Sequence, residues 1–135
     1  MIDGPTRATD LDKTEVNREL VRLFVDEVLI DGQLDKLEHY IDAEDYSEHN
    51  PHRSDGLQSL AAVLTTHADG RTYDKRHRLF AEGSFVLSVC EGSLQGVHSS
   101  FYDLFRVSDG KLGEHWDTVD AIPPRSEWKN ENGKF

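Results

Sequence analysis

Apolar residues in the first half of the chain recur at helical spacing. Five of them share one helical face: Val16, Leu20, Leu23, Phe24 and Val28. This 3.6-residue period predicts a helix from about Leu11 to Ile30. Thr9 or Asp10 can cap its start, and Gly32 ends it. Shorter helices are predicted over about Gln33–Tyr40 and Leu57–Thr66.

From Arg71 onward the apolar period changes to two, which indicates strands. Ala43 to Asn50 is at most one brief strand, stopped by Pro51. Helices followed by a run of strands predict an α+β domain, with N-terminal helices packed on one face of a curved, mixed or antiparallel sheet. Such a sheet encloses a cone with a pocket. The expected strands are Thr72–Ala81, Phe85–Glu91, Val97–Val107 and Leu112–Ala121, and the expected turns are Glu82-Gly83, Glu91-Gly92 (with Gly96) and Asp109-Gly110.

The last hairpin decides which side chains share a face, because side chains alternate along a strand. A two-residue loop at Asp109-Gly110 would pair Ser108 with Lys111 and set Asp103 opposite Trp116. A three-residue loop, which we favour, pairs Val107 with Lys111, Asp103 with His115 and Phe101 with Asp117. It also places Arg106 and Glu114 together on the opposite face.

In that register one face carries two carboxylates and an imidazole among apolar residues. Buried acids cost several kcal/mol unless they are paired or neutralised, and such groups gather at functional sites. The alternative is that Asp103 and Asp117 lie near strand ends in water, with His115 a solvated neighbour. The residues of this face are Phe101, Asp103, Phe105, His115, Asp117 and Val119.

The loop from Tyr46 to His52 holds two imidazoles and an amide beside Pro51. His49 can act as an acid, a base or a donor near neutral pH, and Asn50 offers both a donor and an acceptor. The alternative is that these residues only form the turn that links a strand to the following helix.

Two other kinds of chemistry find little support. His49, His52, His115 and Asp117 are ligand types of a two-His-one-carboxylate centre, as in a metal-dependent oxygenase, but no H-E-x-x-H or C-x-x-C is present and we expect no metal. The position of Cys90 is typical of an inert buried thiol. The sequence contains no G-x-S-x-G motif and no glycine-rich phosphate loop.

The composition limits the kinds of molecule that this protein is expected to bind. The chain has 135 residues, and its formal charge is 15 − 26 = −11. This length fits a loose arm over residues 1–10 and one domain over 11–135. The acidic balance disfavours nucleic acid and anionic membranes. The single cysteine and the absence of an apolar leader lead us to expect a cytoplasmic protein.

Several short motifs together resemble a known family. They are Tyr46-x-x-His49-Asn50-Pro51, Asp55-Gly56, Ala81-Glu82-Gly83-x-Phe85-Val86, Tyr102-Asp103-Leu104-Phe105-Arg106-Val107, Asp109-Gly110-Lys111-x-x-Glu114-His115-Trp116-Asp117 and Asn132-Gly133-x-Phe135. In order and spacing they resemble the SnoaL-like polyketide cyclases, over about residues 15–135. The resemblance implies the cone fold shared with nuclear transport factor two and ketosteroid isomerase, a homodimer built partly on the sheet, and no cofactor. It also implies that Asp117 is the general acid/base of an aldol-type ring closure, with Asp103 where the cyclase has His.

The leading hypothesis is therefore a cofactor-free lyase or isomerase acting next to the carbonyl of a small hydrophobic molecule. Asp117 would be the base or acid, and Asp103 its protonated or His115-paired partner. His49 and Asn50 would orient the substrate, and Phe101 and Phe105 would form an apolar wall. The alternative is a non-catalytic ligand-binding or dimerisation domain whose acids are held in salt bridges.

Overall fold

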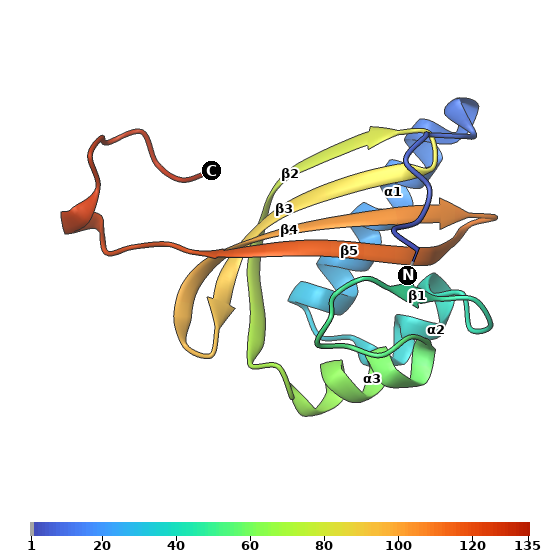
Figure 1. The fold of residues 1–135 in the computed structure, drawn as a ribbon, viewed down its shortest axis with the longest axis horizontal. Helices are drawn as coiled ribbons and strands as arrows, with labels where there is room; N and C mark the ends of the chain where they lie inside the picture. Colours follow the sequence, from blue (N-terminus) through green and yellow to red (C-terminus); the bar gives the residue numbers. More distant parts are fainter. Residues whose placement is uncertain (1) are drawn as a thin grey trace.

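The predicted first helix is one continuous helical segment in the computed structural model, which describes residues 2–135 (Figure 1). It begins as a 3-10 turn over Leu11–Lys13, continues as α1 (Thr14–Phe24) and ends as a π-helical stretch over Val25–Ile30. The expected side-chain cap is absent. Asp10 instead has a left-handed backbone, and its carbonyl accepts a hydrogen bond from the Lys13 N–H.

The shorter elements also follow the apolar pattern. The second predicted helix consists of a 3-10 turn (Leu34–Lys36) and α2 (Leu37–Tyr40), and α3 spans Leu57–Thr66. Ser47–Glu48 forms the two-residue strand β1. No helix of the described residues has the length and apolar character that crossing a membrane requires.

Four long strands complete a five-stranded sheet in the order β1-β5-β4-β3-β2. Consecutive long strands are antiparallel, whereas β1 runs parallel to β5, so the sheet is mixed. A 3-10 turn at Arg125–Glu127 follows in the C-terminal segment. The strands are β2 (Arg71–Glu82), β3 (Phe85–Leu94), β4 (Val97–Ser108) and β5 (Lys111–Ala121).

The β3–β4 turn differs from expectation. Strand β3 continues through Glu91 and Gly92, and the turn falls at Gln95-Gly96, both with positive φ. Position 92 requires glycine because the backbone of β2 lies close to it: a Cβ there would be 1.9 Å from the Thr72 carbonyl oxygen. A glycine inside a strand thus marks packing here and not a turn.

Strand β2 bends sharply before it runs along the sheet (Figure 1). Register shifts accompany the bend, between Tyr73 and Lys75 and between Arg76 and Arg78. A bulge adds an unpaired residue and increases local twist, so two bulges in one strand curl the sheet around its concave face. This curvature forms the cone.

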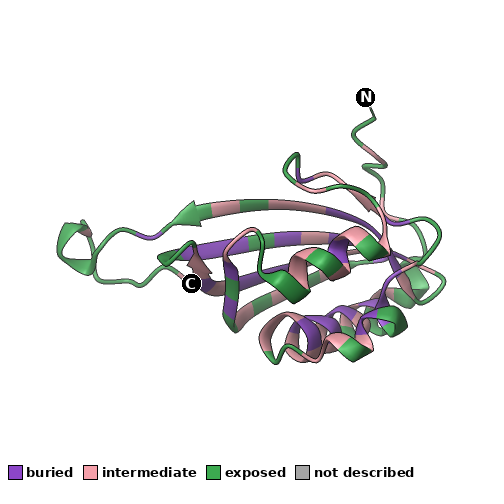
Figure 2. Ribbon diagram, turned by 90° about the horizontal axis from the view of Figure 1, so that it is seen from below, coloured by how far each residue is buried: buried purple, intermediate pink, exposed green. Residues whose placement is uncertain are grey.

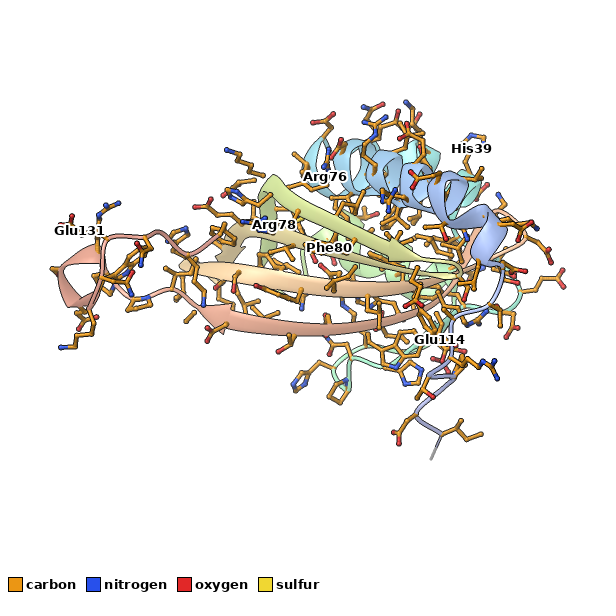
Figure 3. All side chains as sticks on the ribbon, turned by 90° about the horizontal axis from the view of Figure 1, so that it is seen from above. His39, Arg76, Arg78, Phe80, Glu114 and Glu131 are labelled. Atoms are coloured by element: carbon orange, nitrogen blue, oxygen red, sulfur yellow. The ribbon has the colours of Figure 1, made fainter. Side chains whose placement is uncertain are left out.

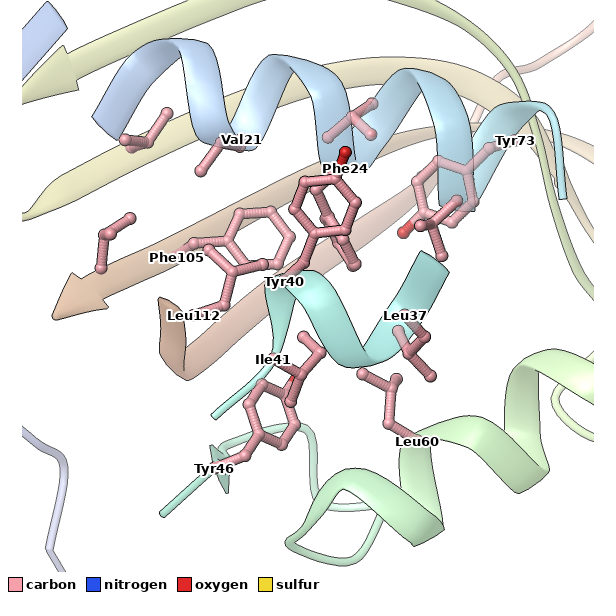
Figure 4. Packing of buried hydrophobic residues seen from close by; sticks show 14 of the residues in the cluster. Val21, Phe24, Leu37, Tyr40, Ile41, Tyr46, Leu60, Tyr73, Phe105 and Leu112 are labelled. Carbon is pink, nitrogen blue, oxygen red and sulfur yellow. The ribbon is translucent and has the colours of Figure 1, made fainter. Parts of the chain in front are cut away.

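The helices cover only the concave face of the sheet, so the buried residues form one layer between them (Figure 2). Phe24 of α1 packs edge-on against Phe105 and Tyr40, at ring-centroid distances of 5.5 and 5.7 Å (Figure 4). The Arg76 guanidinium ties β2 to the π-helical stretch through two hydrogen bonds to Asp26, at 2.9 and 3.0 Å.

The β4–β5 hairpin combines features of both predicted registers. The turn is the two-residue Asp109-Gly110, with φ of 50° and 74°, and Ser108 pairs with Lys111. The favoured three-residue loop is therefore wrong. Gly113 then makes a bulge, after which Arg106 faces Glu114 and Asp103 faces Asp117.

The bulge restores the side-chain parity that the three-residue loop would have given. Phe105 lies opposite His115 and Phe101 opposite Val119. The predicted face is therefore correct in its members, although the cross-strand partners beyond the bulge, those of Asp103 and Phe101, are displaced by two residues.

The N-terminal segment lies against the sheet. Thr9 exchanges backbone and side-chain hydrogen bonds with Ser84 between β2 and β3. The Trp116 indole N–H donates to the Asp3 carbonyl at 3.0 Å. Residues 2–10 thus contact both β5, at Trp116, and the turn between β2 and β3.

Candidate functional site

His115 lies between two carboxylates inside the cone. Its Nε2 is 2.7 Å from Asp103 Oδ1, and its Nδ1 is 2.7 Å from Glu48 Oε1. All three side chains are at most 3% exposed. Because a carboxylate can only accept, both ring nitrogens donate, which describes an imidazolium.

The pKa values of these three groups agree with this geometry. Burial lowers the pKa of His115, but the hydrogen bonds and charges of Asp103 and Glu48 outweigh it and raise the pKa to about 9. Burial raises the pKa of Asp103, yet His115 and Arg71 hold it below its usual value, and Glu48 is lowered in the same way. We name Glu48, His115 and Asp103 the inner triad; it carries two negative charges and one positive charge at neutral pH.

A second group lies next to the triad. The Tyr73 hydroxyl donates to Asp103 Oδ2 at 2.7 Å. Arg71 Nη1 donates to the Tyr73 hydroxyl at 3.2 Å and to Asp117 Oδ2 at 2.9 Å, and it lies 3.8 Å from Asp103 Oδ1. Arg71 thus bridges Asp103 and Asp117, the two aspartates that the sequence predicts on this face.

Asn50 completes the arrangement around Asp117. Its amide Nδ2 donates to Asp117 Oδ2 at 3.0 Å, while its Oδ1 accepts from the His52 backbone N–H. No donor among residues 2–135 reaches the other carboxylate oxygen, Asp117 Oδ1. That oxygen therefore keeps its hydrogen-bond acceptor sites unoccupied by these residues.

A second arginine lies beside the first. Arg53 Nη2 donates to Asp69 Oδ2 at 2.6 Å, and its Nη1 lies 3.8 Å from Glu48 Oε2. Asp69 Oδ2 also lies 3.7 Å from Arg71 Nε, so this carboxylate stands between the two guanidinium groups.

Three cavities border these residues. The inner cavity, between Asp103, His115 and Phe105, measures about 10 Å³ and holds one water molecule at most. The mouth cavity measures about 140 Å³ and lies between the π-helical stretch and α3. The rim groove, of about 450 Å³, contacts Asn50, His52 and Gln95. Arg53 lines all three, and Arg71 lines the two outer ones.

His49 stands apart from this cluster. Its neighbours in the chain, Glu48 and Asn50, point into the cone, whereas the His49 ring stacks on Trp116 at 4.6 Å and contacts Glu114 at 2.6 Å. Glu114 is bound on its other oxygen by Arg106. His49 therefore belongs to a polar cluster on the convex side of the sheet.

Phe101 and Phe105 both lie on the concave face and are buried. Phe101 stacks on Tyr73 at 4.7 Å, with the Arg71 guanidinium 5.1 Å above its ring. Phe105 packs 5.0 Å from the His115 ring and lines the inner cavity.

One set of metal-ligand types converges. Ligand atoms of Asp103, His115 and Asp117 all lie within 4.8 Å of one another, whereas His49 and His52 are not among them. Both nitrogens of His115 are engaged by carboxylates, and Arg71 already provides Asp117 with a cation. A metal would have to displace these contacts.

Four residues of the site are not among those predicted from the sequence: Glu48, Arg53, Arg71 and Tyr73. For Glu48 a signal existed, because Tyr46, Glu48 and Asn50 alternate with outward residues around β1. Arg71 and Tyr73 likewise alternate at the start of β2. Arg53 lies in a loop, where alternation indicates nothing.

The comparisons with known proteins concern the fold. A candidate ketosteroid isomerase from Kribbella flavida superposes with a TM-score of 0.71 at 20% identity, covering 91% of this chain and 93% of that chain. An NTF-2 like protein of unknown function from Burkholderia xenovorans gives 0.70 at 18% identity, covering 90% and 99%. A candidate SnoaL-like polyketide cyclase from Jannaschia gives 0.64 at 20% identity, covering 87% and 92%.

The chain thus has the cone fold of the NTF2-like proteins, among them SnoaL-like cyclases and ketosteroid isomerase-like proteins, as the motifs indicated. No protein-family model and no curated protein matches the sequence.

Proposed function

We propose that this protein carries out cofactor-free acid–base chemistry next to the carbonyl group of a small molecule bound at the mouth of the cone. The observation that carries the proposal is the position of Arg71, which contacts Asp117 at 2.9 Å and also lines the mouth cavity. Enolate chemistry requires a base and a cationic donor, and here the base contacts the donor that lines the cavity.

In the proposed reaction, Asp117 Oδ1 removes a proton from the carbon beside the carbonyl. The C–H bond breaks, its electron pair moves onto the carbonyl oxygen, and the Arg71 guanidinium stabilises the resulting enolate. Asp117 then returns the proton to another carbon in an isomerisation. In an aldol ring closure the enolate carbon attacks a second carbonyl, and the proton goes to the new alkoxide.

The inner triad has a supporting role in this proposal. Asp103 is the His115-paired partner and not a neutral acid, since its pKa is lowered. With Tyr73 it holds Arg71 in place, through the Tyr73 hydroxyl at 3.2 Å. Asn50 likewise holds Asp117 in place, by donating a hydrogen bond to its Oδ2. The structural neighbours described as candidate ketosteroid isomerase and polyketide cyclase support this reaction class by fold alone.

A non-catalytic ligand-binding domain is the second candidate, and one observation favours it. Each charged group of the site has an oppositely charged neighbour within 4 Å, and the inner cavity holds only about 10 Å³. Such pairing is what a binding domain without turnover would show.

We also propose that two copies pair through the convex face of the sheet. Two large apolar side chains are exposed there, Phe80 (56%, labelled in Figure 3) and Tyr102 (40%). Phe80, Leu87 and Leu104 face one another across three strands, and no helix within residues 2–135 covers this side. An apolar patch across neighbouring strands is suited to sheet-to-sheet association.

A proton-exchange experiment distinguishes the two candidate functions. The wild-type protein is incubated in D₂O with a panel of small cyclic ketones, and exchange of the protons beside the carbonyl is followed by NMR. Protein-catalysed exchange at least tenfold above the buffer rate is expected. Saturable binding of the same ketones without any acceleration of proton exchange would refute the proposed enzymatic activity and favour a ligand-binding domain.

A further inference from the structure

The segment after β5 returns to the sheet and forms a groove outside the cone. The chain runs beyond the end of β5, turns at Arg125–Glu127 and doubles back toward the sheet (Figure 1). The Phe135 ring stacks on His77 of β2 with centroids 4.2 Å apart, and Lys134 Nζ lies 3.3 Å from Asp120 Oδ2 of β5. Residues 122–135, which we name the tail, are therefore held at both β2 and β5.

The space between the tail and the sheet, which we name the tail groove, measures about 550 Å³. It is larger than the mouth cavity and the rim groove, and its volume is typical of small-molecule sites. No residue of the inner triad or of the apolar patch lines it. Its apolar walls are Val97, Ile122, Pro123, Pro124, Trp128 and Phe135.

The walls of the tail groove are fixed by hydrogen bonds and by proline. The Trp128 indole N–H donates to the Pro123 carbonyl at 2.9 Å. The Ile122 backbone N–H donates to the His98 carbonyl of β4 at 2.8 Å. Two consecutive prolines restrict the backbone between these contacts. A groove that is already formed lowers the entropic cost of binding a ligand.

The charged groups around the tail groove are unequally matched. Ring nitrogens of His77 and His98 lie 2.8 and 2.6 Å from the two carboxylate oxygens of Glu91, and these contacts hold the pKa of Glu91 below its usual value. The Lys134 ammonium is paired with a carboxylate of β5. No carboxylate among residues 2–135 lies within ion-pair distance of the Arg125 guanidinium. Arg125 is thus the cation of the groove that keeps an unmatched charge.

Arg125 and Trp128 place a cation beside an aromatic surface. The guanidinium carbon of Arg125 lies over the Trp128 ring, 5.6 Å from its centroid. The N–H donors of a guanidinium lie in its own plane, so contact with an aromatic face does not consume them. In that plane two of them match the two oxygens of a carboxylate.

Charge and shape together select the kind of ligand. A cationic ligand would be repelled by Arg125 and Lys134, which both line the tail groove. An uncharged aromatic molecule would cover the apolar walls but leave the charge of Arg125 unmatched. A molecule with an aromatic ring and one carboxylate fits both the walls and the guanidinium.

We infer that the tail groove binds a small aromatic carboxylate, whose ring packs on the apolar walls around Trp128 and whose carboxylate pairs with Arg125. This site is separate from the proposed acid–base site and does not depend on it.

The test is an NMR titration of ¹⁵N-labelled protein with three probes that share the same two fused rings. They are 2-naphthoate, 2-naphthalenemethanol (uncharged) and 2-naphthylmethylammonium (cationic). The chain has two indole N–H signals, and that of Trp116, which does not line the tail groove, is the internal control. We expect 2-naphthoate to shift the Trp128 signal saturably, to leave the Trp116 signal in place, and to bind at least fivefold more tightly than either other probe.

Variants localise the effect to the guanidinium. Arg125→Gln removes the unmatched charge at an exposed position, and it is expected to weaken 2-naphthoate binding at least fivefold while binding of 2-naphthalenemethanol is unchanged. Lys129→Gln is the matched control, because Lys129 is an exposed cation of the same tail that does not line the tail groove. It should leave the binding of both probes unchanged.

Two results would overturn the inference. The first is equal affinity for 2-naphthoate and 2-naphthalenemethanol in the wild-type protein. The second is a Trp128 signal that shifts with protein concentration alone, which would mean that a second copy of this chain fills the tail groove. Neither result bears on proton exchange at the cone, so the two proposals fail separately.

Discussion

The charge of His115 dominates the interior of the cone at the scale of single residues. An imidazolium between two carboxylates neutralises one of two negative charges that the fold would otherwise bury alone. The same pairing prevents Asp103 from acting as a neutral donor. Of the two aspartates on the concave face, Asp117 is thus the one with an oxygen left to react.

This pairing makes stability depend on pH. The folded pKa of His115, about 9, lies above its ordinary value of 6.5, so the proton stabilises the fold. The stabilisation is fully present below pH 6.5 and is lost as pH rises through 9. We expect the free energy of unfolding to fall by about 3 kcal/mol across that window, measured by urea denaturation.

A His115→Gln variant should show most of that pH dependence removed between pH 6.5 and 9. His39→Gln, which alters an exposed imidazole, should retain it. Equal slopes for wild-type protein and His115→Gln would mean that His115 is uncharged in the fold.

At the scale of elements, the alternation of side chains was a reliable guide and the register was not. The three-residue loop predicts Asp103, His115 and Asp117 on one face, and their ligand atoms lie within 4.8 Å of one another there because the Gly113 bulge restores that parity. Their cross-strand partners depend on the Gly113 bulge, which no periodicity reveals. Arg71 and Glu48 come from elements far apart in the chain, and only the sheet topology brings them near Asp103.

The close packing at Gly92 leads to a prediction about β3. A Cβ at this position would lie 1.9 Å from the Thr72 carbonyl oxygen and 2.9 Å from the Phe101 ring. Gly92→Ala should therefore cost about 3 kcal/mol of unfolding free energy, because backbone must move to relieve the clash. Denaturant unfolding measures this cost.

Gly113→Ala is the comparison within the same sheet. Its nearest neighbour is the flexible end of the Arg106 side chain, at 3.2 Å. We expect a loss below about 1 kcal/mol. Equal losses for the two variants would show that the approach of β2 to Gly92 is looser than described.

At the scale of the whole molecule, helices cover one face of the sheet, whereas the other face is open except where residues 2–10 lie against β5. The helical layer, the strand bounds and the cone were largely predictable, since they follow from periods of 3.6 and 2. Cavity volumes were not, because they depend on how α3 and the π-helical stretch pack above Arg53 and Arg71.

The open face leads to a prediction about association. A charge within the apolar patch, as in Tyr102→Glu, should convert a dimer into a monomer in analytical ultracentrifugation. Val16→Glu is the matched control, because Val16 is an exposed apolar residue (67%) on the helical side. A wild-type protein that sediments as a monomer at every concentration would contradict the proposed pairing.

The role of Asp117 is the central claim, and one measurement tests it most directly. The rate of deuterium exchange beside the carbonyl of a bound cyclic ketone is compared between wild-type protein, Asp117→Asn and Asp120→Asn. Asp120 lies on the same strand and is exposed, so its variant controls for the loss of a carboxylate. We predict that Asp117→Asn loses at least tenfold in rate with ketone binding retained, and that Asp120→Asn is unchanged. An Asp117→Asn variant that is folded and exchanges at the wild-type rate would contradict the account.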